Sequence, residues 1–134
     1  MAKKSINPDA MAPPVGPYSH VVSAPAGGRI VFCAGAVALD ADGNVVGKGD
    51  IVAQTRQVME NLRLALESAG ATFEDVVKVT NYVLDASEWQ KVLPVRAEYL
   101  REPYPASTFL EVRALMFPEL LIEIEAVAVV DDQG

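Results

Sequence analysis

Two glutamates near the end of the sequence are the residues best suited to chemistry. Glu123 and Glu125 alternate within the apolar run 121–130, so on an expected strand both side chains share one face, roughly 7 Å apart. Carboxylates are depleted in strands and costly to bury, so this pair needs a physical reason. One reason is ion pairing with Arg113 or with an arginine of another subunit. The other is catalysis, because a half-buried carboxylate is a ready general base.

The other reactive side chains are isolated. His20 is the only histidine and Cys33 the only cysteine, and a metal site or a Cys–His catalytic pair would require both, so we predict no metal. Cys33 lies in an apolar run, where a thiol behaves as a small hydrophobe. His20 shares a strand face with Tyr18 and is interpreted as a surface or interface residue. The glycines lack the spacing of a phosphate-binding loop, which argues against nucleotide binding.

The composition indicates one soluble globular domain over residues 1–134, with an extended arm at 1–15 and a flexible tail at 131–134. The chain is 51% hydrophobic and 22% charged, and its length suits a single core. Its net charge of -7 disfavours binding to nucleic acid, which depends on Lys and Arg. We find neither a signal peptide nor a run of membrane-spanning length, and therefore expect a cytoplasmic protein without membrane contact.

The first half of the chain is expected to form a hairpin followed by a helix. Prolines keep the start of the chain extended, the segment 18–23 reads as a strand, and the apolar run 29–39 reads as a strand buried on both faces. The turn between the two strands predicts that they pair. Asp50 is a good helix N-cap and Gly70 a good C-terminal stop. Between them, apolar residues fall at helical spacing at Val58, Leu62, Ala65, Leu66 and Ala69.

A strand and a second helix follow. The segment 76–84 alternates as a strand, in which Asn81 is the odd polar member of an apolar face. The sequence 87–90, Ser-Glu-Trp-Gln, has the spacing of a capping box and predicts a helix to about Arg101. Pro94 predicts a kink in that helix or a separate first turn.

Two final strands, 106–115 and 121–130, complete the order ββαβαββ. In the first, we expect the face with Thr108 to be core-like and the face with Phe109 to be polar. Two helices cover only one face of such a sheet, so the fold is predicted as a two-layer α+β sandwich. The uncovered face is expected to self-associate, and its mixed surface consists of Phe109, Glu111, Arg113, Glu123, Glu125, Val127 and Val129.

A series of short motifs occurs in a fixed order along the chain. They are Gly16-Pro17-Tyr18-Ser19, Ala34-Gly35, Gln54-Thr55-Arg56-Gln57, Asn61-Leu62, Gly70-Ala71, Val76-Val77-Lys78-Val79-Thr80 and Ile122-Glu123-Ile124-Glu125-Ala126-Val127-Ala128. In this order the chain resembles the RidA/YjgF family, also called the endoribonuclease L-PSP family, over residues 14–130. The resemblance implies a chorismate-mutase-like α+β fold and a homotrimer with clefts between neighbouring subunits.

Characterised deaminases of this family hydrolyse reactive imines and enamines of 2-amino acids to 2-keto acids and ammonia, without a cofactor. The glutamate that positions their attacking water matches Glu123, and the tyrosine of their Gly-Pro-Tyr motif matches Tyr18. The main chain of Gly35 matches another wall of the cleft. The resemblance therefore implies catalytic roles for Glu123 and Tyr18, a small-molecule ligand and no cofactor.

The expected substrate site departs from the family pattern. The deaminases hold the substrate carboxylate with an arginine, and this chain has Ser107 at that position, which loses a charged contact worth roughly 1.5–3 kcal/mol. Phe109 stands in place of a small cysteine, Ala34 in place of a serine and Leu93 in place of an asparagine. These residues predict a bulkier, less polar site. Arg113 is too distant along its own strand to replace the missing arginine. An arginine of a neighbouring subunit is the alternative source of that charge.

Three functions are compatible with this pattern. The first is hydrolysis of an imine, enamine or similar electrophile that carries no 2-carboxylate, with Glu123 activating water and Tyr18 orienting the substrate. The second is a non-catalytic binding or interaction trimer in which Glu123 forms an interface ion pair. The third is the ribonuclease of the family's older name, which the acidic composition and single histidine disfavour.

Overall fold

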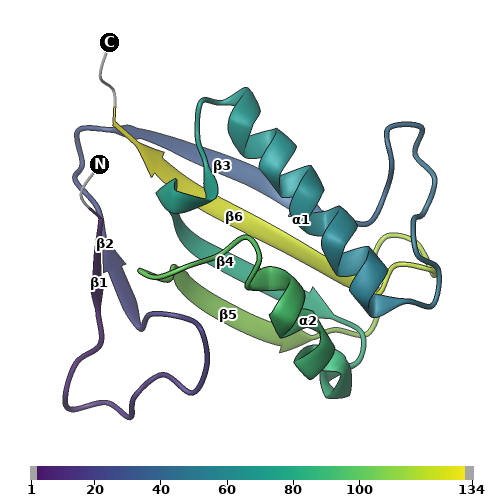
Figure 1. Cartoon of the computed structure of the whole chain (residues 1–134), viewed down its shortest axis with the longest axis horizontal. Helices are drawn as coiled ribbons and strands as arrows, with labels where there is room; N and C mark the ends of the chain where they lie inside the picture. Colours follow the sequence, from purple (N-terminus) through teal and green to yellow (C-terminus); the bar gives the residue numbers. More distant parts are fainter. Residues whose placement is uncertain (1–2, 132–134) are drawn as a thin grey trace.

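Two helices pack on one face of a four-stranded mixed sheet in the computed structural model, which describes residues 3–131 (Figure 1). The sheet order is β3-β6-β4-β5, and β4 and β5 are its parallel pair. The elements are β1 (Lys4–Ile6), β2 (Val21–Ser23), β3 (Arg29–Ala36), α1 (Ile51–Ser68), η1 (Phe73–Asp75), β4 (Val76–Val83), η2 (Ala86–Glu88), α2 (Trp89–Arg96), β5 (Ala106–Glu111) and β6 (Ile122–Val130). The predicted α+β sandwich is confirmed, with one additional strand at the start.

The N-terminal segment differs from the predicted hairpin. The extra strand β1 lies within the expected arm and pairs with β2 in a separate two-stranded sheet, so β2 does not pair with β3. The predicted strand 18–23 is shorter than expected, and Ser19 makes an isolated bridge to Ala106 instead. Of the two ends, the first two residues and all of the expected tail except Asp131 lie outside the described residues.

Helix α1 begins and ends where the sequence predicts. The Asp50 carboxylate accepts hydrogen bonds from the backbone amides of Val52 and Ala53, and Gly70 adopts a positive φ of 76° just beyond the end. Its buried face includes Val58, Met59, Leu62 and Leu66, whereas the predicted core residue Ala65 is exposed. This face covers β3 and β6 (Figure 1).

Helix α2 corrects the predicted capping box. The side chain of Asp85, rather than that of Ser87, caps the short η2 turn by accepting from the Ser87 amide, and α2 itself has no side-chain cap. The helix ends at Arg96 instead of near residue 101. Pro94 lies inside the helix, and η2 forms the predicted separate first turn. A proline has no amide proton, so position 94 cannot donate a hydrogen bond to the preceding turn.

The faces of the sheet follow from strand register. Strand β6 alternates as predicted: Ile122, Ile124, Ala126 and Ala128 are buried under the helices, and Glu123 and Glu125 point to the opposite, open face. Strand β5 is reversed from the prediction. Ser107 pairs with buried Val79 and Phe109 pairs with buried Asn81, so both lie on the helix side. Phe109 and Glu111 therefore do not share a face with Glu123.

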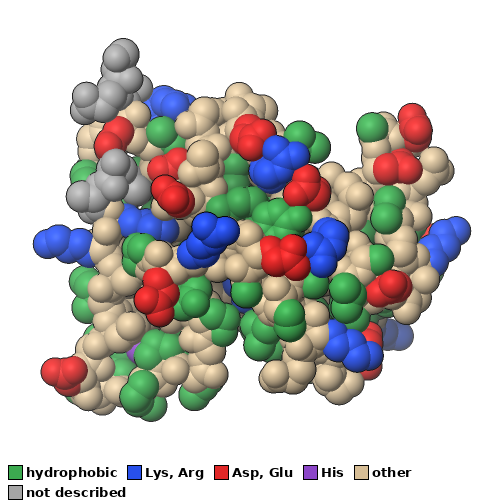
Figure 2. Space-filling model, viewed as in Figure 1, with side chains coloured by type: hydrophobic (Ala, Val, Ile, Leu, Met, Phe, Trp, Pro, Cys, Tyr) green, Lys and Arg blue, Asp and Glu red, His purple; other side chains and the backbone are tan. Residues whose placement is uncertain are grey.

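The open face of the sheet is apolar at β3 and β6. Ile30 is 60% exposed and Phe32 is 77% exposed, and they pair with Val129 and Val127 of β6. The prediction that β3 is buried on both faces is therefore wrong for the single chain. The helix side differs, because Figure 2 shows acidic and basic side chains interspersed over it. Within residues 3–131, no helix is long and apolar enough to cross a membrane.

Candidate functional site

A hollow of about 460 Å³ lies between the N-terminal segment and helix α2. Figure 2 shows the corresponding notch at the lower edge of the molecule. Four of the residues singled out in the sequence line it, namely Tyr18, Leu93, Ser107 and Phe109. The other lining residues are Val15, Gly16, Pro17, Trp89, Gln90 and Arg96. We call this hollow the α2 pocket.

Hydrogen bonds to the chain before β5 hold Tyr18 at the mouth of the α2 pocket. The neighbouring Ser19 is buried, its amide donates to the Pro105 carbonyl at 3.0 Å and its hydroxyl donates to the Tyr104 carbonyl at 2.6 Å. The phenol oxygen of Tyr18 accepts from the amide of Val15 at 3.4 Å. These contacts bring a tyrosine from the start of the chain beside a strand near its end.

His20 supports this loop rather than the pocket. Its ring packs edge-on against Tyr18 at 5.6 Å between centroids, and its Nε2 lies 2.7 Å from the Ala12 carbonyl oxygen. Its backbone amide donates to the side chain of Asn7. His20 does not line the α2 pocket. His20 is partly buried within the N-terminal segment.

Aromatic side chains form one wall of the α2 pocket, and Asn81 lies behind it, hydrogen-bonded to the pocket residue Ser107. Trp89 and Phe109 are in contact, with ring centroids 4.3 Å apart and planes tilted by 48°. Asn81, the odd polar residue of β4, is fully buried, and its Nδ2 donates to the Ser107 hydroxyl at 3.0 Å and to the Thr108 carbonyl at 2.8 Å. The amide thus fixes the orientation of Ser107.

Arg96 is a pocket residue that the sequence analysis missed. It is only 3% exposed, its guanidinium lies 5.3 Å from the ring centroid of Trp89, and it lines the α2 pocket. Burial lowers the pKa of Arg96 to about 10, so the side chain keeps its charge at neutral pH. One signal could have revealed it: Trp89, Leu93 and Arg96 have i, i+4, i+7 spacing, which places all three on one face of a helix.

Glu123 and Gly35 form a second group, on the open face of the sheet. A Cβ added at Gly35 would fall 1.8 Å from Oε2 of Glu123, so the backbone of β3 contacts this carboxylate directly. Partial burial, and secondarily the charge of Glu125, raise the pKa of Glu123 above its usual value of 4.5. Glu125 accepts a short hydrogen bond from the hydroxyl of Tyr82. Ala34, beside Gly35, is exposed.

The predicted site residues therefore divide between the two faces of the sheet. Ser107 shares a face with Val79 and Ala126, whereas Glu123 shares the opposite face with Tyr82. The sheet therefore lies between the α2 pocket and Glu123.

Two further features carry no reactive arrangement. Cys33 is a buried thiol whose pKa is raised by burial, as expected for a core residue. In residues 3–131, no group of three or more His, Cys, Asp or Glu side chains has metal-binding geometry.

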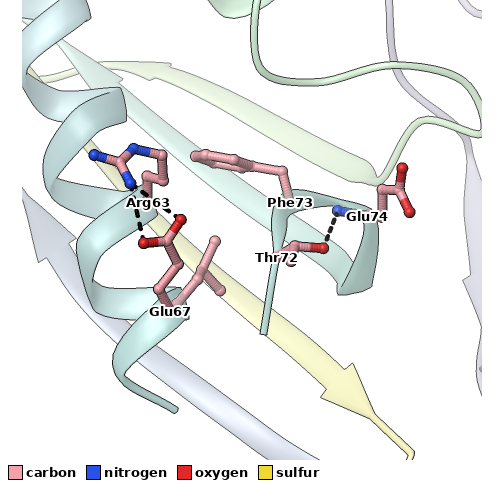
Figure 3. A pocket seen from close by; sticks show the side chains of 6 residues that line it. Arg63, Glu67, Thr72, Phe73 and Glu74 are labelled. Atoms are coloured by element: carbon pink, nitrogen blue, oxygen red, sulfur yellow. Dashed lines mark hydrogen bonds and ion pairs between the residues drawn. The ribbon is translucent and has the colours of Figure 1, made fainter. Parts of the chain in front are cut away.

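Another hollow, of about 370 Å³, lies between α1 and η1 (Figure 3). Its arginine, Arg63, is bound by Glu60 and Glu67, with nitrogen–oxygen distances of 2.9 and 3.0 Å. Thr72 accepts from the amide of Glu74 in the N-cap of η1. These polar groups already have partners, so the hollow is a weaker site candidate than the α2 pocket.

Comparison with known proteins gives matches along almost the whole chain. The profile of the family described as endoribonuclease L-PSP matches residues 9–130. A RutC family protein of Pyrococcus abyssi is 41% identical over 128 residues, which are 96% of this chain and 98% of that one. The 3-aminoacrylate deaminase RutC of Acinetobacter baylyi is 37% identical, with the same two coverages.

Solved structures show the same fold. A protein of the conserved Rid family from Yersinia pestis, described as of unknown function, superposes with a TM-score of 0.88 at 41% identity. The alignment covers 97% of this chain and all of that one. RidA from an Antarctic Psychrobacter superposes with a TM-score of 0.71 at 30% identity, over 95% of this chain and 99% of that chain.

Proposed function

Because the chain belongs to the endoribonuclease L-PSP family, which includes the Rid and RutC proteins, we propose that it is a trimeric hydrolase of small imines or enamines. Its active sites lie in clefts between neighbouring subunits. The observation that carries this proposal is the division of the site, with the α2 pocket on one face of the sheet and Glu123 on the other. A neighbouring chain that packs on the open face receives Glu123 at its own α2 pocket.

The open face has the properties of a subunit interface. Ile30 and Phe32 are large exposed apolar residues, and together with Val127 and Val129 they form a continuous patch across β3 and β6. Apolar patches of this kind mark association sites in soluble proteins. Trimer formation would remove this patch from water and bring Glu123 to the rim of the neighbour's pocket.

The reaction follows from the proposed arrangement. Glu123 accepts a proton from water, whose oxygen adds to the carbon of the C=N bond, and Tyr18 and the main chain at Gly35 orient the substrate. The glutamate returns its proton to the nitrogen of the tetrahedral adduct, and the hydroxyl proton of the adduct passes to the same nitrogen as the C=O bond forms and the C–N bond breaks, which releases ammonia. An enamine enters this sequence after its N–H proton has moved to carbon to give the imine. Each turnover consumes one water and yields a carbonyl compound and ammonia.

The preferred substrate differs from a 2-imino acid. Ser107 stands where the deaminases bind a 2-carboxylate, and a serine cannot form the bidentate contact of a guanidinium. The relative named 3-aminoacrylate deaminase supports an enamine whose carboxylate is not on the nitrogen-bearing carbon. We therefore assign the enzyme to small enamines and imines of that kind.

Ammonia release tests the proposal. 2-Aminoacrylate and 3-aminoacrylate are generated enzymatically in the assay, and we expect the protein to accelerate ammonia release from 3-aminoacrylate much more than from 2-aminoacrylate. Glu123→Gln should reduce the catalysed rate by about 10²- to 10⁴-fold, the usual contribution of a general base. Robust activity on 2-aminoacrylate would show that the loss of the arginine does not exclude the standard substrate.

A non-catalytic binding trimer is the second candidate, and the apolar Trp89–Phe109 wall of the α2 pocket favours it. In that case neither enamine is hydrolysed faster than in buffer. Glu123→Gln would then leave ligand affinity intact and weaken the trimer instead. Cleavage of RNA that depends on Tyr18 or Glu123 would be needed to support the ribonuclease function.

A further inference from the structure

Arg96 is a buried cation without a counter-charge in the part of the chain that the structure describes. Among residues 3–131, Nε and Nη2 of its guanidinium are buried, and neither atom has a hydrogen-bond partner. The other arginines of the helices differ, since Arg56 pairs with Glu98 and Arg63 pairs with Glu60 and Glu67. A buried guanidinium is costly unless something satisfies its donors. A bound ligand or a neighbouring chain could supply these missing acceptors.

The surroundings of Arg96 leave the α2 pocket as the place for that partner. The ring of Trp89 contacts the guanidinium through a cation–π interaction but supplies no hydrogen-bond acceptor. Among the described residues, none that lines the pocket carries a carboxylate. Across the pocket, the Ser107 oxygen accepts from Asn81, which leaves the Ser107 hydroxyl proton free to donate. Arg96 and Ser107 thus offer donors to this space, beside Gln90 and Tyr18, whose side chains can both donate and accept.

We propose that Arg96 binds the carboxylate of the substrate in the α2 pocket, with the Ser107 hydroxyl as a second donor. The proposal deepens the proposed function by naming the group that the substrate must carry. A guanidinium offers parallel N–H donors that match the two oxygens of a carboxylate. The charge missing from position 107 of β5 is thereby supplied from helix α2, which approaches the pocket from another direction.

The approach from α2 also explains the choice of substrate. A carboxylate held by Arg96 and the short Ser107 side chain lies nearer to α2 than one held by an arginine at position 107, which changes the distance between the carboxylate and the carbon presented to the neighbour's glutamate. An enamine with its carboxylate one carbon farther from the nitrogen suits this arrangement. Arg96 is then a residue that determines specificity.

One arrangement competes with this proposal. In the trimer, Glu123 of a neighbouring subunit could itself pair with Arg96, and the arginine would then serve only assembly. The two arrangements differ in what a free carboxylate does. A substrate site binds it, whereas an interface ion pair excludes it.

The fluorescence of Trp89 reports on binding directly, because it is the only tryptophan and contacts both Arg96 and Phe109. The assembled wild-type protein is titrated with propionate and with propionamide, which has the same shape without the charge. We expect propionate to bind more tightly. Arg96→Met should weaken propionate binding by about ten- to a hundredfold and change propionamide binding less than about twofold.

Arg101→Met is the matched control, because it removes the same charge from an exposed position outside the α2 pocket. It should bind propionate like the wild type. Arg96→Lys keeps the charge without the planar donors and should be intermediate. If Arg96→Met does not fold, the proposal is tested with Arg96→Lys and with the NMR signal of the Arg96 Nε–H group in the wild type. That signal should shift when propionate is added.

Several results would overturn the proposal. Arg96→Met or Arg96→Lys could bind propionate as well as the wild type, or the Nε–H signal could stay unchanged at saturating propionate. Glu123→Gln could also dissociate the trimer as strongly as Arg96→Met does, which would identify an interface ion pair. We expect Glu123→Gln to retain propionate binding.

These binding measurements require no turnover. A protein that binds propionate through Arg96 but releases no ammonia would retain this inference while the proposed hydrolase function fails. Hydrolysis that is insensitive to Arg96→Met would support the hydrolase function while the carboxylate-binding role of Arg96 fails. The two failures are therefore distinguishable.

Discussion

The backbone at Gly35 touches the carboxylate of Glu123, and a Cβ at position 35 would lie 1.8 Å from Oε2, 2.7 Å from Cδ and 2.9 Å from Cγ. All three atoms belong to one flexible side chain, so an added methyl group would displace the carboxylate rather than the sheet. The strand position of the glycine is thus coupled to the orientation of the proposed general base.

Gly35→Ala should therefore separate activity from folding. We expect enamine hydrolysis to fall about a hundredfold, because a displacement of roughly 1 Å at a catalytic group has an effect of that size. Thermal unfolding and trimer mass should remain close to the wild type. Gly27→Ala is the control, since a Cβ there meets no atom within 4 Å. Full activity in Gly35→Ala would remove the positioning role of this contact.

The ionisation of Glu123 sets the expected pH dependence. Partial burial and the charge of Glu125 raise the pKa of Glu123, and a general base works only when ionised, so activity should decline as the pH falls through a value above 4.5. The effect on stability has the opposite sign. The folded state favours the protonated form, so this group contributes stability below pH 4.5 that is lost as the pH rises through its folded pKa.

Glu125→Gln tests the electrostatic part of that shift. Removing the neighbouring charge should lower the pKa of Glu123 and move the acidic limb of the kcat/KM profile to lower pH. Glu119→Gln removes the same charge from an exposed loop and should leave the limb in place. An acidic limb that does not move in Glu125→Gln would mean that Glu123 is not the titrating group.

The regular parts of the fold were predictable because local signals and burial agree. Asp50 and Gly70 bound α1 as expected, since a cap and a positive-φ glycine act within a few residues. The alternation of β6 also holds, because Ile124 and its neighbours on that face are strongly apolar and those opposite are charged. In strand β5 the pattern predicted the wrong face: the residues beside Thr108 are more apolar than those beside Phe109, yet Phe109 packs against Trp89 on the helix side.

The candidate site was predictable only in part. Family motifs located Tyr18, Ser107 and Glu123, but not their division between two faces of the sheet, which depends on register between distant strands. Arg96 was missed because an arginine on an amphipathic helix usually lies in solvent. Its burial depends on the ring of Trp89 and on where α2 packs, and neither is encoded locally.

The open sheet face yields a prediction about assembly. Phe32→Asp places a charge in the apolar patch of β3 and β6, where Phe32 is 77% exposed in the single chain. We expect the molar mass in light scattering to fall from three times 14.3 kDa toward that of one chain, and hydrolysis to fall with it. Leu64→Asp, at an exposed position on the outer face of α1, should leave both unchanged. A trimeric Phe32→Asp variant would place the interface elsewhere.

Asn81 links the stability of the sheet to the α2 pocket. Its amide donates to Ser107 and to the carbonyl of Thr108, and both contacts are removed in Asn81→Ala. Each hydrogen bond contributes about 0.5–1.5 kcal/mol, so loss of the two should lower the free energy of unfolding in urea by about 1–3 kcal/mol at fixed protein concentration.

Ser107→Ala provides the comparison, because it removes the pocket hydroxyl and retains the hydrogen bond from Asn81 to Thr108. It should lose less stability than Asn81→Ala, by about 1 kcal/mol or more. Both variants should weaken carboxylate binding, since one removes the Ser107 donor and the other releases its orientation. Equal destabilisation by the two variants would show that the Thr108 contact contributes nothing, and unchanged binding in both would leave Arg96 as the sole carboxylate donor of the pocket.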